Sequence, residues 1–159
     1  MSLIKSSTMC ALLWITMVMT ARSVLSQATS EAPKPPEFER ITAEELKAKI
    51  ARNEPVTILD VRSGDVYSRS DSKIRGAMFV RYRRLESRLA VPPLKDLPRS
   101  AEVVTYCSCP DEATSGRAAQ VLLAAGFKRV RALKGGWLAW LDAGGQVEFK
   151  PRGQDEAFL

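Results

Sequence analysis

Two cysteines, Cys107 and Cys109, stand one residue apart and are the side chains best suited to covalent chemistry. A thiolate is a nucleophile, and a pair of neighbouring thiols can also form a disulfide. The apolar run at residues 103–106 ends at Cys107 and is typical of a buried strand, while residues 115–125 are typical of a helix. In open α/β sheets the carboxyl ends of the strands bind ligands, so the sequence predicts a reactive thiol at that edge.

The helix expected after the cysteines would bring its N-terminus close to both thiols. Unpaired backbone N–H groups and the helix dipole stabilise an anion there, such as a thiolate, a persulfide or a bound oxyanion. Arg117 falls in the first turn of this expected helix, where a cation opposes the dipole. It either points to solvent or faces an anion bound at the same site.

Metal and phosphatase chemistry have little support in the sequence. The chain has no histidine, and two thiols fill only half of a tetrahedral zinc site. A phosphatase-like loop requires an arginine six positions after its cysteine. Ala113 holds that position relative to Cys107, and Ser115 holds it relative to Cys109. We therefore predict no metal site.

The elements that must position this loop alternate between strands and helices. Strands are expected at residues 56–61, 77–80, 103–106 and 129–133, and helices at residues 43–52, 65–69, 82–89, 115–125 and 137–143. A capping box formed by Thr42 and Glu45 marks the start of the first helix. The alternation predicts an α/β fold, with a parallel sheet of about five strands and helices on both faces.

Residues 1–28 have the composition of a targeting segment. Lys5 precedes an apolar run at residues 10–21, which as a helix is about 18 Å long, too short for a bilayer core of about 30 Å. This layout is typical of a secretory signal peptide cleaved after Ala28, and the alternative is an uncleaved membrane anchor. We predict export to the periplasm. A Pro-rich linker at 29–37, one domain at 38–149 and a C-terminal tail at 150–159 follow.

Export would change the chemistry of the remaining chain. Cys107 and Cys109 would be the only cysteines left, in an oxidising compartment that favours a disulfide or another oxidised form. The formal charge would fall from +6 to +4, because Lys5 and Arg22 are lost without an acidic residue. The densest basic cluster is at positions 81, 83, 84 and 88. It is either a solvated face or a rim that draws anionic substrates towards the site.

Short segments in a fixed order carry a family resemblance. They are Ile58-Leu59-Asp60-Val61-Arg62, Ile74-Arg75-Gly76-Ala77, Tyr106-Cys107 with Ser115, Ala118-Ala119 and Leu122, and Gly126-Phe127 followed by Leu133-Lys134-Gly135-Gly136 and Trp140. In this order and spacing the chain resembles a rhodanese domain over about residues 38–147. The resemblance adds the expectation that the α/β sheet is rhodanese-like.

The resemblance implies a sulfurtransferase or persulfide carrier. A cysteine takes a sulfane sulfur from a small anionic donor such as thiosulfate and passes it to a thiol or cyanide acceptor, without a metal or organic cofactor. The catalytic candidates are Cys107 and Cys109. The candidates for substrate binding are Ser108, Asp111, Glu112, Ala113, Thr114, Ser115, Arg117 and Arg62. A partner protein could serve as acceptor, whereas nucleic acid is not expected, nor is a membrane after signal cleavage.

The loop departs from the family pattern and leaves alternatives open. Counted from Cys107, Ser115 lies two residues too far; counted from Cys109 the spacing fits, but Cys109 does not directly follow the strand. Either an enlarged loop uses Cys107, which we favour, or Cys109 is the nucleophile. Asp111 and Glu112 would disfavour a nearby thiolate if they pointed inward. A thiol–disulfide redox protein and a non-catalytic binding module are therefore alternative functions.

Overall fold

The computed structural model describes residues 35–150, which are built around a five-stranded parallel sheet. The predicted signal peptide, its cleavage after Ala28 and most of the predicted linker and tail lie outside the described residues. Within residues 35–150, no helix is both long and apolar enough to cross a membrane.

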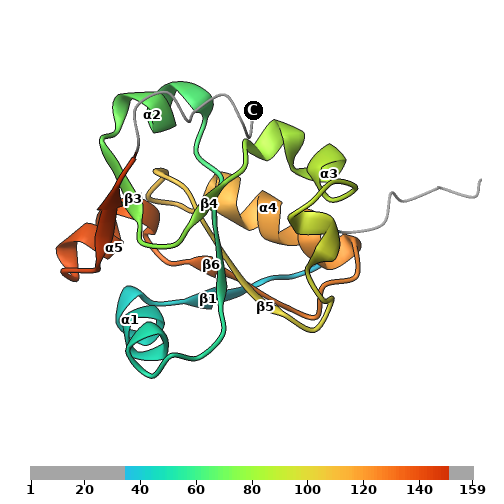
Figure 1. Cartoon of the computed structure of the whole chain (residues 1–159), viewed down its shortest axis with the longest axis horizontal. Coiled ribbons are helices and arrows are strands. Elements are labelled where there is room, and N and C mark those ends of the chain that lie inside the picture. Colours follow the sequence, from blue (N-terminus) through green and yellow to red (C-terminus); the bar gives the residue numbers. More distant parts are fainter. Residues whose placement is uncertain (1–34, 151–159) are drawn as a thin grey trace, which may run out of the picture. The chain divides into compact units, whose positions relative to one another are not determined.

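Helices and strands alternate along most of the chain, as Figure 1 shows. In chain order the elements are β1 (Glu39–Ile41), α1 (Ala43–Ala51), β2 (Thr57–Asp60), α2 (Gly64–Arg69), β3 (Ser72–Ile74), β4 (Met78–Phe79), the 3-10 helix η1 (Tyr82–Arg84), α3 (Leu85–Arg88), the 3-10 helix η2 (Leu94–Asp96), β5 (Glu102–Tyr106), α4 (Ala113–Ala124), β6 (Arg129–Leu133), α5 (Gly136–Asp142) and β7 (Val147–Phe149).

The main sheet has the strand order β1-β6-β5-β2-β4, and every neighbouring pair is parallel. β5 is central, with Asp60 of β2 aligned with Tyr106 on one side and Ala132 of β6 aligned with Thr105 on the other. All five residues of β5 are buried, as expected for a strand covered on both faces. The parallel sheet confirms the predicted α/β fold and brings the ends of β2, β4, β5 and β6 to one edge.

Helices cover the two faces of the sheet with separate apolar clusters (Figure 1). On one face Leu122 of α4 and Leu85 of α3 pack against Val103. On the other face Leu46 of α1 and Trp140 of α5 pack against Val104. Successive residues of a strand point to opposite faces, so the adjacent valines of β5 serve one cluster each. This confirms the predicted helices on both faces.

Most predicted helices and strands begin and end near their expected bounds. Three short strands, β1, β3 and β7, were not predicted. The capping box is present, since Glu45 N–H donates to Thr42 Oγ1 and the Glu45 carboxylate accepts from Thr42 N–H. β1 adds the fifth strand of the main sheet, and β3 pairs with β7 as a separate antiparallel ribbon. α4 begins at Ala113, two residues earlier than expected, so Arg117 lies in its second turn rather than its first.

A buried ion pair holds the carboxyl end of β2. Arg62 Nη2 lies 2.6 Å from Asp60 Oδ2, and the side chains are 1% and 0% exposed. Tyr106 Oη donates to the same carboxylate oxygen at 2.6 Å and accepts from Ile74 N–H at 3.2 Å. Burial, and the negative charge of Asp60 beside it, raise the pKa of Tyr106, so the phenol stays protonated and remains a donor. The network joins β2, β3 and β5.

Removing one partner of this network should destabilise the fold strongly. We expect Asp60→Ala to lower the free energy of unfolding by about 3–5 kcal/mol, because it leaves the Arg62 guanidinium buried without its counter-ion. Tyr106→Phe should cost about 1–3 kcal/mol through one unsatisfied amide and one lost donor. Urea unfolding measures both, with the exposed Asp142→Ala as control. A loss below about 1 kcal/mol for Asp60→Ala would contradict this account.

Candidate functional site

Cys107 follows β5 directly and lies beside the N-terminal turn of α4. Its residue is 1% exposed. Cys109 N–H donates to Cys107 Sγ at 3.3 Å, and the thiol lies 3.5 Å from Ser115 Oγ and 3.8 Å from the Cys109 carbonyl oxygen. Ser115 is itself buried, and its hydroxyl donates to the Glu112 carbonyl at 3.2 Å. The sulfur is therefore surrounded by polar groups of the loop and of the first turn of α4.

Opposing influences act on the pKa of Cys107. Burial is the largest and raises the pKa above the ordinary value of 9.0. The Ser115 hydroxyl and the backbone N–H groups of Cys109 and Ser115 act in the other direction, while a charge on Cys109 would raise the pKa further. Burial outweighs the hydrogen bonds, so the thiol form predominates at neutral pH. The same donors are placed to stabilise negative charge on sulfur when it forms.

Cys109 is the more accessible of the two cysteines. It is partly exposed, and its Sγ lies 3.7 Å from Thr114 Oγ1 in the first turn of α4. Both cysteines are free thiols in the structure. Within residues 35–150 no cluster of three or more Cys, Asp or Glu residues is arranged to hold a metal ion.

The two carboxylates of the loop are turned away from the buried sulfur. Glu112 Oε1 accepts from Gly135 N–H at 2.7 Å, and Oε2 accepts from Arg40 Nε at 3.0 Å. Asp111 is exposed, and its carboxylate accepts from Ala113 N–H at 3.2 Å at the start of α4. These partners lie on β1, on the turn after β6 and on α4. Neither carboxylate is therefore directed at the Cys107 sulfur.

Glu112 holds a backbone conformation that few non-glycine residues adopt. Its φ is 54° and its ψ is 18°, in the left-handed region, at the N-cap of α4. Such a conformation costs about 1 kcal/mol or more and persists where surrounding contacts determine it. The bonds from Gly135 and Arg40 supply those contacts. They fix the turn that directs the loop into the helix.

The start of α5 closes the back of the loop. Trp137 N–H donates to the Cys107 carbonyl at 2.8 Å. Gly136 has φ 56°, and a Cβ at this position would lie 2.2 Å from the same carbonyl oxygen, so only glycine fits. The sequence showed Gly135-Gly136 only as a turn, and its role in supporting the cysteine loop was not predicted. A glycine pair directly after a strand at the ligand-binding edge was the available signal.

The other residues that the sequence suggested for substrate binding differ in their exposure to solvent. Ser108 and Thr114 are partly exposed, and Ala113 is exposed at the start of α4. Arg117 is exposed and makes no hydrogen bond or ion pair with another described residue, so its side chain points to solvent. Arg62 is buried in the ion pair with Asp60, and its guanidinium carbon lies 4.9 Å from the centre of the Trp137 ring.

The basic cluster after β4 divides into separate environments. Arg81 is partly buried, and a Cβ on Gly64 would lie 2.4 Å from its guanidinium, which shows that this group packs against the turn after β2. Arg83 and Arg84 are exposed in η1. Of the four arginines, Arg81 therefore contacts the turn at which β2 meets the ligand-binding edge of the sheet.

Fold and site together define an α/β domain whose buried cysteine lies in a strand-to-helix loop at the carboxyl edge of a parallel sheet. Residues 42–143 match the family model of the rhodanese-like domain. The chain belongs to the rhodanese-like domain family, which confirms the resemblance found in the sequence. No curated protein sequence gives a significant match.

Solved structures share this fold. The Alr3790 protein from Anabaena sp. is 31% identical, with 75% of this chain and 100% of that chain covered and a TM-score of 0.62. A Rhodopseudomonas palustris protein of unknown function, described as a possible tyrosine phosphatase, is 28% identical over 70% of this chain and 85% of its own, with a TM-score of 0.58. A thiosulfate sulfurtransferase from Pseudomonas aeruginosa shares the fold at 24% identity and a TM-score of 0.59, over 71% of this chain and 20% of its own.

Loss of the Glu112 carboxylate should loosen the loop in a pH-dependent way. Burial alone would raise the pKa of Glu112, but the bonds from Gly135 N–H and Arg40 outweigh it and lower the pKa below 4.5. Because the folded pKa is the lower one, this stabilisation is complete above about pH 4.5 and is lost as the pH falls through the folded value. We expect Glu112→Gln to cost about 1–3 kcal/mol at neutral pH.

Denaturant unfolding at neutral and acidic pH measures this effect. The difference between wild type and Glu112→Gln should shrink as the pH falls below 4.5. Glu86→Gln, at an exposed position of α3, is the matched control and should change the free energy of unfolding by less than about 0.5 kcal/mol. A difference that stays constant across this pH range would show that Glu112 does not act through its charge.

Proposed function

We propose that this chain is a sulfurtransferase or persulfide carrier that uses Cys107 as its nucleophile. The observation that carries the proposal is the position of Cys107 Sγ, 3.3 Å from the donating N–H of Cys109 and 3.5 Å from Ser115 Oγ at the start of α4. A sulfur that bears negative charge, as thiolate or as persulfide, is stabilised by the backbone N–H groups of Cys109 and Ser115, and by the Ser115 hydroxyl once it turns from the Glu112 carbonyl to the sulfur. Membership of the rhodanese-like family supports the same chemistry.

The proposed reaction has two steps that balance without a cofactor. The Cys107 thiolate attacks the sulfane sulfur of a donor such as thiosulfate, a new S–S bond forms, and sulfite leaves with the electron pair of the broken bond. A nucleophile such as a thiolate or cyanide then attacks the outer sulfur of the persulfide and releases the Cys107 thiolate. No net oxidant or reductant is consumed, and the proton lost from the thiol at the start passes to solvent.

The burial of Cys107 favours small reactants. A sulfur in a residue that is 1% exposed is reached by a compact anion more readily than by a folded partner protein. A thiol or cyanide is the proposed acceptor, and a partner protein would need to present an extended cysteine. We propose that this chemistry takes place after export, with the chain free of the membrane once its signal peptide is removed.

A second candidate, thiol–disulfide exchange, is favoured by the closeness of the two cysteines. The Cys109 amide contacts Cys107 Sγ, and both thiols are free. A disulfide closing so small a ring is strained and therefore oxidising. The two candidates differ in the fate of Cys109, because a persulfide on Cys107 needs only one cysteine whereas a disulfide needs both.

Single-cysteine variants separate these functions. After reduction and incubation of the exported chain with thiosulfate or inorganic polysulfide, we expect the wild type and Cys109→Ser to gain one sulfur atom. Cys107→Ser should gain none. Intact mass spectrometry, with and without a reductant, gives the readout. Sulfur gain in the wild type and in Cys107→Ser, but not in Cys109→Ser, would assign the nucleophile to Cys109. Loss of two hydrogen atoms in the wild type, with no sulfur gained by any variant, would favour the redox function.

The reactivity of Cys107 should increase towards alkaline pH. Burial raises the pKa of this thiol above 9.0, so the thiolate fraction and the alkylation rate should still be rising at that pH. We expect Ser115→Ala to move the midpoint further upward, since the hydroxyl stabilises the thiolate. Iodoacetamide kinetics in the Cys109→Ser background isolate Cys107, with Ser108→Ala as the matched serine control. A midpoint below 9.0 in that background would contradict the dominance of burial.

A further inference from the structure

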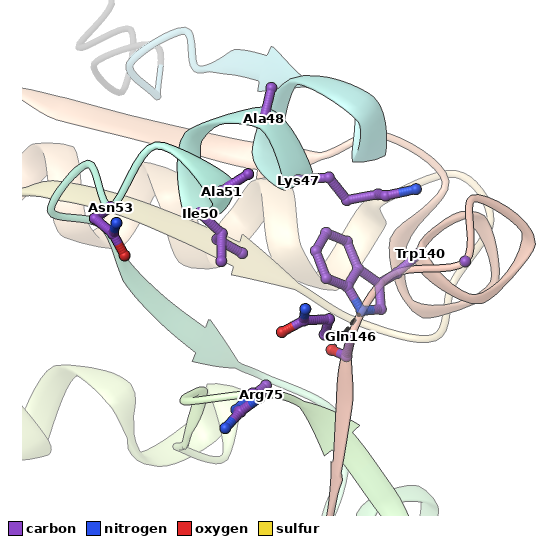
Figure 2. A pocket seen from close by; sticks show the side chains of 9 residues that line it. Lys47, Ala48, Ile50, Ala51, Asn53, Arg75, Trp140 and Gln146 are labelled. Atoms are coloured by element: carbon purple, nitrogen blue, oxygen red, sulfur yellow. Dashed lines mark hydrogen bonds between the residues drawn. The ribbon is translucent and has the colours of Figure 1, made fainter.

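A cavity of about 680 Å³ lies between α1, the segment after β3 and the end of α5. Figure 2 shows Lys47 and Ile50 on α1, the Trp140 ring beside this helix, and Arg75 on a separate segment. Its volume falls within the range of small-molecule sites, about 300–1,000 Å³. None of the residues that line it belongs to the cysteine loop.

The walls of this cavity are mainly apolar. Ala48, Ile50 and Ala51 contribute one side of α1, and the indole of Trp140 closes the floor. The Trp140 residue is 1% exposed, and its Nε1–H is already satisfied by the Gln146 carbonyl at 3.1 Å. Because the indole is almost completely covered, the apolar wall open to a ligand is formed by Ala48, Ile50 and Ala51 of α1. A small apolar group fits such a wall.

Cationic and amide groups converge on the rim. Arg75 is exposed, and its side chain donates no hydrogen bond to another described residue. The side-chain amides of Asn53 and Gln146 are likewise unengaged among the described residues, and no carboxylate lines the cavity. Glu148 interacts electrostatically with Arg75 but is paired with Lys73 at 3.0 Å. The rim therefore favours an anion.

Backbone contacts hold the walls in place without a ligand. The Gln146 carbonyl accepts from both Trp140 Nε1 and Arg75 N–H, which joins α5 to the segment after β3. The Lys47 ammonium donates to the Ala143 carbonyl and joins α1 to the end of α5. Three separate segments are thus fixed around one space. A site already formed in this way loses little affinity to ordering on binding.

We propose that this cavity binds a small organic acid, an apolar body that carries one carboxylate or sulfonate. The apolar body lies against Ala48, Ile50 and Ala51 of α1, and the acid group lies at Arg75 with the Asn53 and Gln146 amides nearby. The site is independent of sulfur transfer, because its residues are separate from Cys107 and its neighbours.

The probe for this proposal is 2-naphthoate, and 2-naphthamide is its neutral counterpart. We expect the full chain to bind naphthoate saturably, with a Kd of about 1 mM or tighter for a ligand of this size. The amide should bind at least about fivefold more weakly, because it cannot pair with Arg75. Calorimetric titration gives the affinities, and amide chemical-shift changes should concentrate at Ile50, Ala51 and Gln146.

Two variants and two controls make the test specific. Arg75→Gln should weaken naphthoate binding by about fivefold or more and leave naphthamide binding unchanged. Ala51→Phe fills the cavity from an exposed position of α1 and should weaken both probes by about tenfold or more. Arg83→Gln removes an equally exposed arginine in η1 and should leave binding unchanged. Cys107→Ser should bind naphthoate as the wild type does, which separates this site from the proposed sulfur transfer.

Several results would overturn the proposal. Naphthoate and naphthamide binding with equal affinity would remove the role of the cation. Equal losses of naphthoate affinity in Arg75→Gln and Arg83→Gln would show that only the net charge of the protein matters. Shift changes at the cysteine loop instead of α1 would move the ligand to another site. Failure of Ala51→Phe to fold would leave Arg75→Gln to decide the question.

Discussion

The buried charge of Arg62 is the constraint on which the site depends. A guanidinium that is 1% exposed requires a counter-ion, and Asp60 supplies it while the Tyr106 phenol links Asp60 to the Ile74 amide. Tyr106 is the last residue of β5, so the requirement that fixes its hydroxyl also fixes the backbone immediately before Cys107. A structural ion pair on β2 thus positions a thiol on the neighbouring strand.

The cysteine loop after Tyr106 is also held by the turn after β6 and by the start of α5. Gly136 allows the Cys107 carbonyl to approach, Trp137 N–H binds it, and Glu112 binds Gly135 N–H. The Gly135 and Arg40 contacts hold the Glu112 carboxylate away from the sulfur, and Ala113 N–H binds the exposed Asp111 carboxylate at the start of α4. The electrostatic conflict expected from the acidic residues is therefore removed by their direction, and the enlarged loop is compatible with a sulfur that gains negative charge.

The sequence predicted those helices and strands whose positions are determined by apolar periodicity and by capping residues. Buried strands such as β5 and capped helices such as α1 follow from local patterns, and the alternation of strands and helices predicted the parallel sheet. β1, β3 and β7 were not predicted, because they are only three residues long and too short to show an apolar pattern of their own. The direction of the Glu112 side chain could not be predicted from the sequence either, because it depends on the Gly135 amide 23 residues away and on a left-handed backbone.

In the proposed function, which includes export, the burial of Cys107 also affects how two neighbouring thiols coexist with sulfur chemistry. Burial outweighs the hydrogen bonds and keeps the resting sulfur protonated, and a protonated thiol is a poor nucleophile towards oxidants and disulfides alike. The same donors stabilise charge once a sulfane sulfur is bound. In the proposed function the pocket therefore disfavours premature oxidation of the thiol and favours the persulfide. Cys109, which is more exposed, would be the first of the pair to meet an oxidant.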